Sequence, residues 1–358
     1  MNKCTTAAAV KQYRRAGWML QEQCARKARK GKDLHMIKRL GRGVLAFDNP
    51  PTLRESAAIV GSKEGEGPLG NSFDEVWDDA KLGEDTWEKA ESALQNSAMA
   101  CLLKKAKIEK TELDALFAGD LLNQLVGSHY GLRDYDIPLV GLYGACSTMA
   151  QSLAMAGLFI SSGGGASAVA ITSSHFCASE RQFRMPLAYG NQRTPSIGEG
   201  PFLRGIAIGR IQDKGITDVN NMGAAMAPAA AETIQDYLIH TVTAPEDYDL
   251  ILTGDLGHVG SDLLLDLLAR EGYEIGKQHQ DCGLMIYDLA NQNVASGGSG
   301  CGCSAVVLCS SILPQIRSKQ LNNVLFVGTG ALMSPTTTFQ GESIPSIAHL
   351  VHISTSRT

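Results

Sequence analysis

The sequence lacks an apolar run that could cross a membrane. Its longest apolar stretch, residues 150–171, is interrupted by SSGGG at 161–165, which is too polar for the middle of a membrane helix. The apolar residues 7–10 are too few for a secretory signal, and charged residues follow them closely. We therefore expect a protein made in the cytoplasm that has no transmembrane segment and meets membranes only peripherally.

A disulfide framework and a zinc knuckle are also missing. The nine cysteines are odd in number and show no paired spacing. Cys301 and Cys303 are separated by a single residue, which is too close for a zinc knuckle, and no second pair answers them. This usage predicts free thiols in a reducing compartment and no resident metal or cofactor.

Positive charge is scarce outside the first part of the chain. Residues 1–43 hold 12 Lys and Arg against Glu22 and Asp33, while the remainder holds 20 basic and 35 acidic residues. We interpret residues 1–43 as a basic N-terminal extension, helical over 5–30. It is either solvated or in contact with anionic lipid or an acidic partner. No basic motif interleaved with aromatic residues occurs elsewhere, so nucleic acid is not an expected partner.

The most informative feature present is GACST at 144–148. An apolar run at 138–142 precedes it and a run rich in Ala, Leu and Met at 149–160 follows, which predicts a buried strand, a tight turn and a helix. Backbone N–H groups and the positive end of the helix dipole would favour a Cys146 thiolate. Such a thiol attacks an acyl group, or its pocket holds an anion without chemistry.

The chain contains an internal echo. LFAGDL at 116–121 recurs as ILTGDL at 251–256, and cysteines follow the two glycines after 27 and 28 residues. The apolar run 324–329 likewise corresponds to the strand before His175. Two similar α/β halves predict sheets covered by helices on both faces, with Cys146 and His175 brought towards residues 254–260 and 281–282 at a shared seam. Chance recurrence of common strand sequences is the alternative.

Several motifs together resemble a known family. They are GEGPLG (65–70), AGDLLNQ (118–124), YGACST (143–148), TSSH (172–175), ERQFR (180–184), GAAMAPAAA (223–231), DCG (281–283) and GGSGC (297–301). The duplicated halves resemble the thiolase and β-ketoacyl synthase superfamily. Within it the motifs resemble the stage V sporulation protein AD family of endospore-forming bacteria, over roughly residues 44–352.

This resemblance implies both a fold and a function. The fold is α/β, thiolase-like, with a duplicated five-layer αβαβα body made of an N-terminal half (44–215) and a C-terminal half (216–358). The function is non-catalytic binding of dipicolinic acid (pyridine-2,6-dicarboxylate), taken with calcium into the developing spore. The implied partners are integral membrane proteins of the same spore channel assembly, and the implied location is peripheral at the forespore or spore inner membrane. Homodimerisation is common in the superfamily.

The alternative is an acyl-CoA-dependent thiolase or β-ketoacyl synthase that uses Cys146 as its nucleophile. Such enzymes resemble one another in a Gly-His-Pro or His-Gln-Ala-Asn signature after second-half strands, and neither occurs here. Asp255 stands after the strand instead, where its charge would repel a developing oxyanion. His258 is the one candidate replacement and is displaced by a few residues. A purely structural scaffold is the third possibility.

The predicted ligand-binding residues surround the cysteine turn and the seam. Backbone N–H groups after Cys146, a histidine donor and two arginines at the mouth suit a dicarboxylate, and carboxylate oxygens suit calcium arriving with it. The set is Cys146, Ser147, His175, Arg181, Arg184, Asp255, His258, Asp281 and Cys282, with Asp120 as a further oxygen donor. Each has an ordinary structural alternative: a buried thiol, a strand or turn cap, or a solvated charge.

Overall fold

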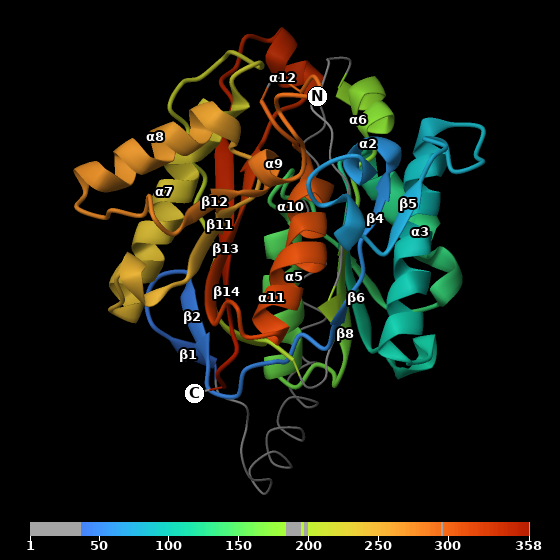
Figure 1. The fold of residues 1–358 in the computed structure, drawn as a ribbon, viewed down its shortest axis with the longest axis horizontal. Helices are drawn as coiled ribbons and strands as arrows, with labels where there is room; N and C mark the ends of the chain where they lie inside the picture. The colour runs from blue at the N-terminus through green and yellow to red at the C-terminus, as the bar shows by residue number, and fades with distance from the viewer. Residues whose placement is uncertain (1–36, 184–194, 197–199, 295, 358) are drawn as a thin grey trace, which may run out of the picture.

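The computed structural model describes residues 37–183, 195–196, 200–294 and 296–357. These residues form five layers, in the order helix, sheet, helix, sheet, helix (Figure 1). The predicted five-layer α/β fold is therefore confirmed. Most of the basic extension, including the helix expected over 5–30, and Arg184 lie outside the described residues.

The larger sheet has seven strands. Its order is β1 (Ile37–Arg39), β2 (Val44–Phe47), β10 (Phe202–Ala207), β14 (Ser346–Ser354), β13 (Asn323–Ala331), β11 (Leu250–Thr253) and β12 (His279–Asp281). Strand β11 is parallel to β12 and β13, whereas β14 is antiparallel to both β13 and β10. The sheet thus mixes a parallel part, which ends at the candidate site, with an antiparallel part.

The smaller sheet is entirely parallel. Strand β6 (Ala115–Gly119) lies between β7 (Leu139–Gly141) and β8 (Ala168–Thr172). All residues of β6 and β8 are buried, as expected for strands covered on both faces. Two short ladders accompany this sheet: β3 (Glu55–Ser56) with β9 (Pro195–Ser196), and β4 (Ile59–Gly61) with β5 (Glu75–Trp77).

The two sheets repeat one arrangement. The order β7-β6-β8 in the first half matches β12-β11-β13 in the second, with the middle strand parallel to both neighbours each time. The echoed motifs lie on these middle strands, so their recurrence reflects a structural duplication. The division predicted between residues 215 and 216 remains a prediction, because β10 precedes it and yet pairs with β14.

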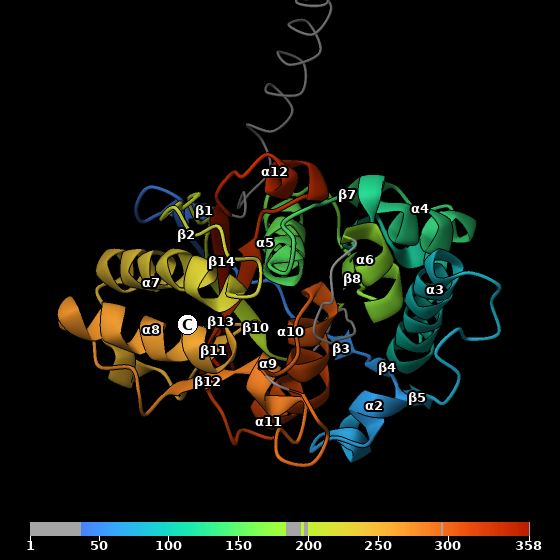
Figure 2. The same ribbon diagram turned by 90° about the horizontal axis from the view of Figure 1, so that it is seen from above.

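Helices fill three layers. Figures 1 and 2 show α7 and α8 outside the larger sheet, α3 and α4 outside the smaller one, and α5, α10 and α11 between the sheets. Their bounds are α3 (Trp87–Ala106), α4 (Val126–Leu132), α5 (Thr148–Ser161), α7 (Met222–Thr241), α8 (Gly257–Arg270), α10 (Cys301–Val307) and α11 (Leu313–Arg317). Shorter helices are α2 (Ser62–Gly65), α6 (Phe176–Phe183), α9 (Cys282–Met285) and α12 (Pro335–Phe339).

Helix α3 illustrates how the local sequence sets the elements. The Thr86 hydroxyl accepts a hydrogen bond from the Lys89 N–H, and the helix ends where Lys107 adopts a left-handed conformation. A threonine cap of this kind stabilises a helix by about 1 kcal/mol. Ala90, Leu94 and Ala98 form a buried stripe along one face of the helix.

The core is largest between the two sheets. Helix α5 contributes Met149, Ala150, Leu153 and Ala154 to it, and all four are buried. Because sheets cover both sides of α5, apolar residues surround much of the helix and it shows no wide polar face. Among the described residues, no helix combines the length and hydrophobicity needed to span a membrane.

Candidate functional site

Cys146 lies in the turn between β7 and α5, as predicted. Ala145 adopts a left-handed backbone conformation with φ of 48°, and Ser147 immediately precedes the helix. The hydroxyl and the N–H of Ser147 both donate to the Gly144 carbonyl, at 2.6 and 3.0 Å, and the Thr148 N–H donates to the Ala145 carbonyl at 3.2 Å. These donors therefore close the turn, and the expected N–H cradle for a bound anion after Cys146 is occupied.

Asp255 faces the cysteine from the second half. The Cys146 thiol donates a hydrogen bond to its buried carboxylate. The same carboxylate accepts hydrogen bonds from the Ser299 hydroxyl at 2.9 Å, the Gly300 N–H at 3.1 Å and the Thr329 hydroxyl at 2.8 Å. Four chain segments thus meet at one carboxylate, at the ends of strands from both halves.

The electrostatics of this meeting contradict the expected thiolate. Burial, followed by the neighbouring Asp255 charge, raises the pKa of Cys146 well above its usual value. Burial also raises the pKa of Asp255, although its hydrogen bonds oppose the shift. A thiol that keeps its proton is a poor nucleophile, so the turn holds a neutral sulfur at neutral pH.

Asp281 supports the loop that carries Asp255. Its carboxylate accepts hydrogen bonds from the Thr253 hydroxyl at 2.7 Å, the Leu256 N–H at 2.9 Å and the Gly257 N–H at 3.1 Å. Burial raises its pKa to about 6. The predicted proximity of Asp281 to the seam is thus observed, but its oxygens bind the first turn of α8.

A cavity of about 550 Å³ adjoins Asp255. Helices α7 and α8 both begin at its wall, through Met222 and Gly257. The lining mixes apolar and polar residues, and its polar members are Lys63, Asn220, Asn221, Asp255, His258, Asn293, Ser296 and Ser299. Its size is typical of a small-molecule site, and oxygen atoms outnumber cationic groups among the side chains.

Comparison with known proteins identifies the family. A profile described as Stage V sporulation protein AD (SpoVAD) matches residues 41–354. Stage V sporulation protein AD of Bacillus subtilis (strain 168) is 42% identical over 328 residues, which cover 87% of this chain and 97% of that protein. The chain belongs to the stage V sporulation protein AD family. Its role is accordingly in sporulation.

Solved structures agree with the fold of this family member. Xanthomonas campestris OleA aligns with a TM-score of 0.53 at 12% identity, over 89% of this chain and 99% of the other. A 3-oxoacyl-(acyl-carrier-protein) synthase III from Aquifex aeolicus aligns with a TM-score of 0.47 at 13% identity, over 73% and 84%. At such identities the likeness concerns the thiolase-like fold alone.

His175 of this stage V sporulation protein AD family member has its ring engaged elsewhere. Its Nδ1 accepts from the Ala178 N–H at 3.5 Å, and its Nε2 lies 2.6 Å from the Ala80 carbonyl oxygen. The ring also lies 5.4 Å from that of Trp87, and burial lowers its pKa. His175 is a neutral cap at the start of α6, so the expected donation to a ligand beside Cys146 would break an existing contact.

Three other predicted residues are not brought to the cysteine. The Arg181 side chain is 65% exposed and pairs with Glu88 at 3.4 Å, as a surface charge would. Cys282 is fully buried in the core between the sheets. His258 is exposed on the first turn of α8, where it lines the cavity.

Sequence reasoning missed Ser299, Thr329 and Glu91. Ser299 lies within GGSGC, one of the motifs on which the family resemblance rests. The motif marked this loop, but it gave no sign that Ser299 binds Asp255. Thr329 lies in the apolar run of β13 and gave no signal. Glu91 is a fully buried acid on α3, and its only signal is a charge that falls on the same helical face as buried apolar residues.

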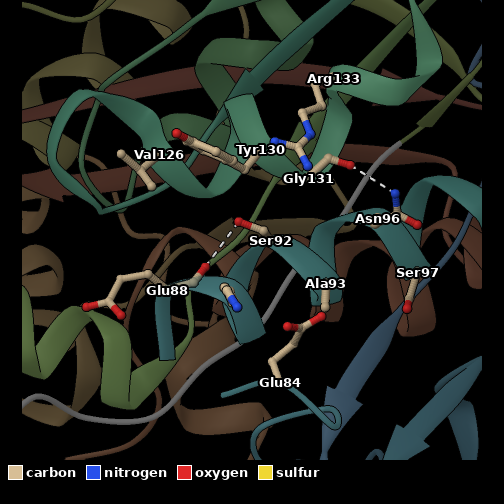
Figure 3. Close-up of a pocket in the computed structure, with 11 residues that line it drawn as sticks. Glu84, Glu88, Ser92, Ala93, Asn96, Ser97, Val126, Tyr130, Gly131 and Arg133 are labelled. Carbon is tan, nitrogen blue, oxygen red and sulfur yellow. Dashed lines mark hydrogen bonds between the residues drawn. The ribbon is translucent and has the colours of Figure 1, made fainter. Parts of the chain in front are cut away.

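The first half has a separate groove on its outer surface. It measures about 780 Å³ and lies between α3 and α4. Figure 3 shows Tyr130 and Arg133 on one wall and Ser92 and Asn96 on the other, with the guanidinium carbon of Arg133 5.2 Å from the centre of the Tyr130 ring. None of the predicted ligand residues lines this groove.

Proposed function

We propose that this protein binds dipicolinic acid together with calcium, without catalysis, for uptake into the developing spore. Membership of a sporulation family supports the setting. The cavity beside Asp255, with its several polar side chains, supports binding of a small ligand that carries polar groups.

The observation that carries the proposal is the contact between the Cys146 thiol and the Asp255 carboxylate. A condensing enzyme needs a thiolate and donors that stabilise an oxyanion. Here burial, followed by the Asp255 carboxylate, raises the pKa of the thiol, and the same negative charge would repel an oxyanion. The arrangement preserves the cysteine turn while opposing both requirements of acyl transfer.

The cavity chemistry suits a calcium chelate better than a free dianion. Calcium prefers oxygen ligands, and Asp255 and Ser299, which carry a carboxylate and a hydroxyl, line the cavity. Lys63 is the lysine in the lining and matches a ligand carboxylate. Calcium bound by dipicolinate also offsets the repulsion between the dianion and Asp255.

Calorimetry with dipicolinate, in the presence and absence of calcium, tests this function. We expect saturable binding that calcium strengthens. Asp255→Asn is expected to lose about tenfold to a hundredfold in affinity, because a charged ligand contact is removed. Arg181→Ala is the matched control, since it removes a surface charge remote from the cavity. Absence of heat at millimolar ligand would contradict the proposal.

The enzymatic alternative has its own readout. Incubation with acetyl-CoA followed by intact-mass measurement would detect a thioester on Cys146. We expect no acetylation. A thioester that a second acyl acceptor consumes, and that Cys146→Ala abolishes, would establish acyltransfer instead.

We also propose peripheral attachment at the spore inner membrane beside integral membrane partners of the channel assembly. The basic residues 1–43 support contact with an anionic surface. Sedimentation with anionic liposomes tests it: deletion of residues 1–36 should abolish co-sedimentation, and neutral liposomes are the control. Equal sedimentation of both forms would count against the arm as an anchor.

A homodimer forms part of this proposal. Strand β7 is an open edge of its sheet. Val140 on this strand is 43% exposed, and Tyr143, which follows the strand, is 47% exposed. An uncharged apolar edge favours pairing with another strand. Light scattering should show a dimer that Val140→Asp converts to monomer, whereas Val259→Asp on α8 leaves it unchanged. A monomer at micromolar concentration would refute this element.

A further inference from the structure

Two carboxyl groups lie together in the interior of the first half. Glu91 projects from α3, Asp120 follows β6, and both are fully buried. A Cβ atom added to Gly127 in α4 would lie 2.8 Å from Cγ of Glu91 and 3.1 Å from Cγ of Asp120. Gly127 therefore lies against both side chains, and its lack of a side chain leaves space for the pair.

Hydrogen-bond donors, but no basic side chain, contact Glu91. Its Oε1 accepts from the Ser173 hydroxyl at 2.6 Å and its Oε2 from the His175 N–H at 2.9 Å. The charges of Asp120 and Glu88 both raise the pKa of Glu91. The ring of His175 is committed to Ala80 and Ala178 and is neutral.

Asp120 has a similar environment. Its carboxylate accepts from the Leu122 N–H at 2.8 Å and from the N–H and the hydroxyl of Ser128, both at 2.7 Å. His129, on the next position of α4, is the basic residue whose charge acts on it. Asp120 thus has the better support for a negative charge.

The pair retains a proton at neutral pH. Two buried like charges repel each other strongly in a medium of low dielectric constant. Burial and the Asp120 charge raise the pKa of Glu91 to about 8. One turn further along α3, Oε1 of the buried Gln95 has no hydrogen-bond partner within the described residues, so the cluster contains a spare acceptor on the same helical face.

Hydrogen bonds connect Glu91 to the candidate site. Ser173, which binds Glu91, accepts a hydrogen bond through its carbonyl from the Cys301 thiol at 2.9 Å. The neighbouring Thr172 hydroxyl donates to the Cys301 carbonyl at 3.1 Å. Gly300, directly before Cys301, donates its N–H to Asp255. A continuous series of contacts thus runs from the first-half carboxyl pair to the carboxylate beside Cys146.

We infer that Glu91 is a positioning residue for the Cys146–Asp255 site, acting while the Glu91–Asp120 pair retains one proton. Ser173 and His175 donate to Glu91, and the Ser173 carbonyl accepts from the Cys301 thiol, which holds the segment 299–301 against Asp255. Ionisation of Glu91 places two negative charges in one buried space and displaces this segment. The consequence for ligand affinity rests on the proposed function, whereas the consequence for the cysteines does not.

Calorimetry with calcium and dipicolinate across neutral to alkaline pH tests the effect on the ligand. The wild-type affinity should fall above the pKa of Glu91, by at most about tenfold per pH unit for one linked proton. Glu91→Gln, which keeps a neutral side chain of the same shape, should bind like wild type at the lowest pH and lose this dependence. Glu88→Gln, on the same helix but paired at the surface, should keep it.

Alkylation of Cys146 and Cys301 by iodoacetamide, followed by peptide mass spectrometry, gives a readout without ligand. As pH rises through the range in which Glu91 ionises, the alkylation rate of wild type should increase relative to that of Glu91→Gln. Asp120→Asn removes the repelling charge from Glu91, so the ionisation of Glu91 and the associated rise in rate should move to lower pH. This second variant keeps the test available if Glu91→Gln does not fold.

These outcomes separate the two proposals. If no variant binds dipicolinate but the alkylation profiles differ as expected, the proposed function fails and the role of Glu91 stands. If wild type and Glu91→Gln show the same pH dependence in alkylation and in any measurable binding, the role of Glu91 is overturned. An alkylation midpoint that Asp120→Asn leaves unchanged would overturn that role as well.

Discussion

Asp120 and Asp255 occupy the same position in the two halves, one residue after the glycine that ends the echoed strand motif. Asp120 uses its oxygens within its own connection, on Leu122 and Ser128. Asp255 receives donors from three distant places, the Ser299–Gly300 loop, Thr329 and the Cys146 thiol. The duplication therefore repeats a residue but not its role.

The difference follows from what lies beyond each strand end. In the first half, residues 120–128 form a compact connection into α4 whose N–H groups need an acceptor. In the second half, Asp281 already accepts from the Leu256 and Gly257 N–H groups. Asp255 is therefore not needed for these N–H groups, and it accepts a hydrogen bond from Cys146 of the first half. One acid closes a turn, and its counterpart joins the halves.

The largest contrast is expected at the two glycines before these acids. A Cβ on Gly119 would overlap the Leu142 carbonyl oxygen, whereas on Gly254 its nearest neighbour is the Thr329 hydroxyl at 3.0 Å. Gly119→Ala should lower the free energy of unfolding by about 3 kcal/mol or more, or prevent folding, and Gly254→Ala by about 1 kcal/mol. Urea unfolding followed by circular dichroism measures both. Equal losses would show that the halves tolerate crowding alike.

Neutralising each acid sharpens the comparison. Asp120→Asn places an amide where Ser128 donates, and should cost about 1–3 kcal/mol of stability. Asp255→Asn removes the charge beside the thiol and should lower the pKa of Cys146. The pH dependence of iodoacetamide alkylation at Cys146 measures the second effect. A larger shift in Asp120→Asn than in Asp255→Asn would reverse the roles assigned to the two residues.

Two sets of buried groups should respond oppositely to pH. In the second half, burial lowers the pKa of His279 and His349 to about 4 and of His352 to about 3. Their contribution is fully present above about pH 6.5, the ordinary histidine pKa, and is lost as pH falls towards these values. In the first half, Glu91 contributes stability below its ordinary pKa of 4.5, and loses it as pH rises through about 8.

Urea unfolding at a series of pH values tests this opposition. His352→Asn should flatten the acid side, because the unfolded state then gains one proton fewer than in wild type. Glu91→Gln should flatten the alkaline side. If the free energy of unfolding depended on pH in both variants as it does in wild type, the assignment of these groups would be contradicted.

The smallest effect is expected at Arg181. Its pair with Glu88 is largely exposed, and exposed pairs contribute about 0–1 kcal/mol. Arg181→Ala should change the free energy of unfolding by less than about 1 kcal/mol and leave dipicolinate affinity unchanged. A measurable loss of affinity would return Arg181 to the mouth of the site, as the sequence alone suggested.

Local sequence was sufficient for much of the fold. The apolar strand runs and the echoed motifs predicted the elements and the duplication, because these signals act over a few residues. The position of Cys146 at a strand-to-helix turn was predictable for the same reason. The addition of β1, β2 and β10 to the larger sheet was not predictable, because strands that pair with distant parts of the chain carry no local sequence signal of that pairing.

The chemistry of the site was harder to predict for a physical reason. A thiolate at Cys146 follows from the turn and the helix alone, and Asp255, which opposes it, comes from the other half. His175 was correctly placed after a strand, but its ring is turned to Ala80 in a preceding loop. Glu91 looked like an ordinary helical charge, since burial depends on the packing of α4 and β8 against α3.

Strand β14 lies between β10 and β13 in the larger sheet. During synthesis, β10 and β13 emerge from the ribosome before the strand that separates them. The nascent chain must therefore keep two apolar strand edges unpaired until residues 346–354 arrive. A premature stop before this strand would yield a product that exposes these edges and is prone to aggregation and proteolysis, despite containing most of the polypeptide.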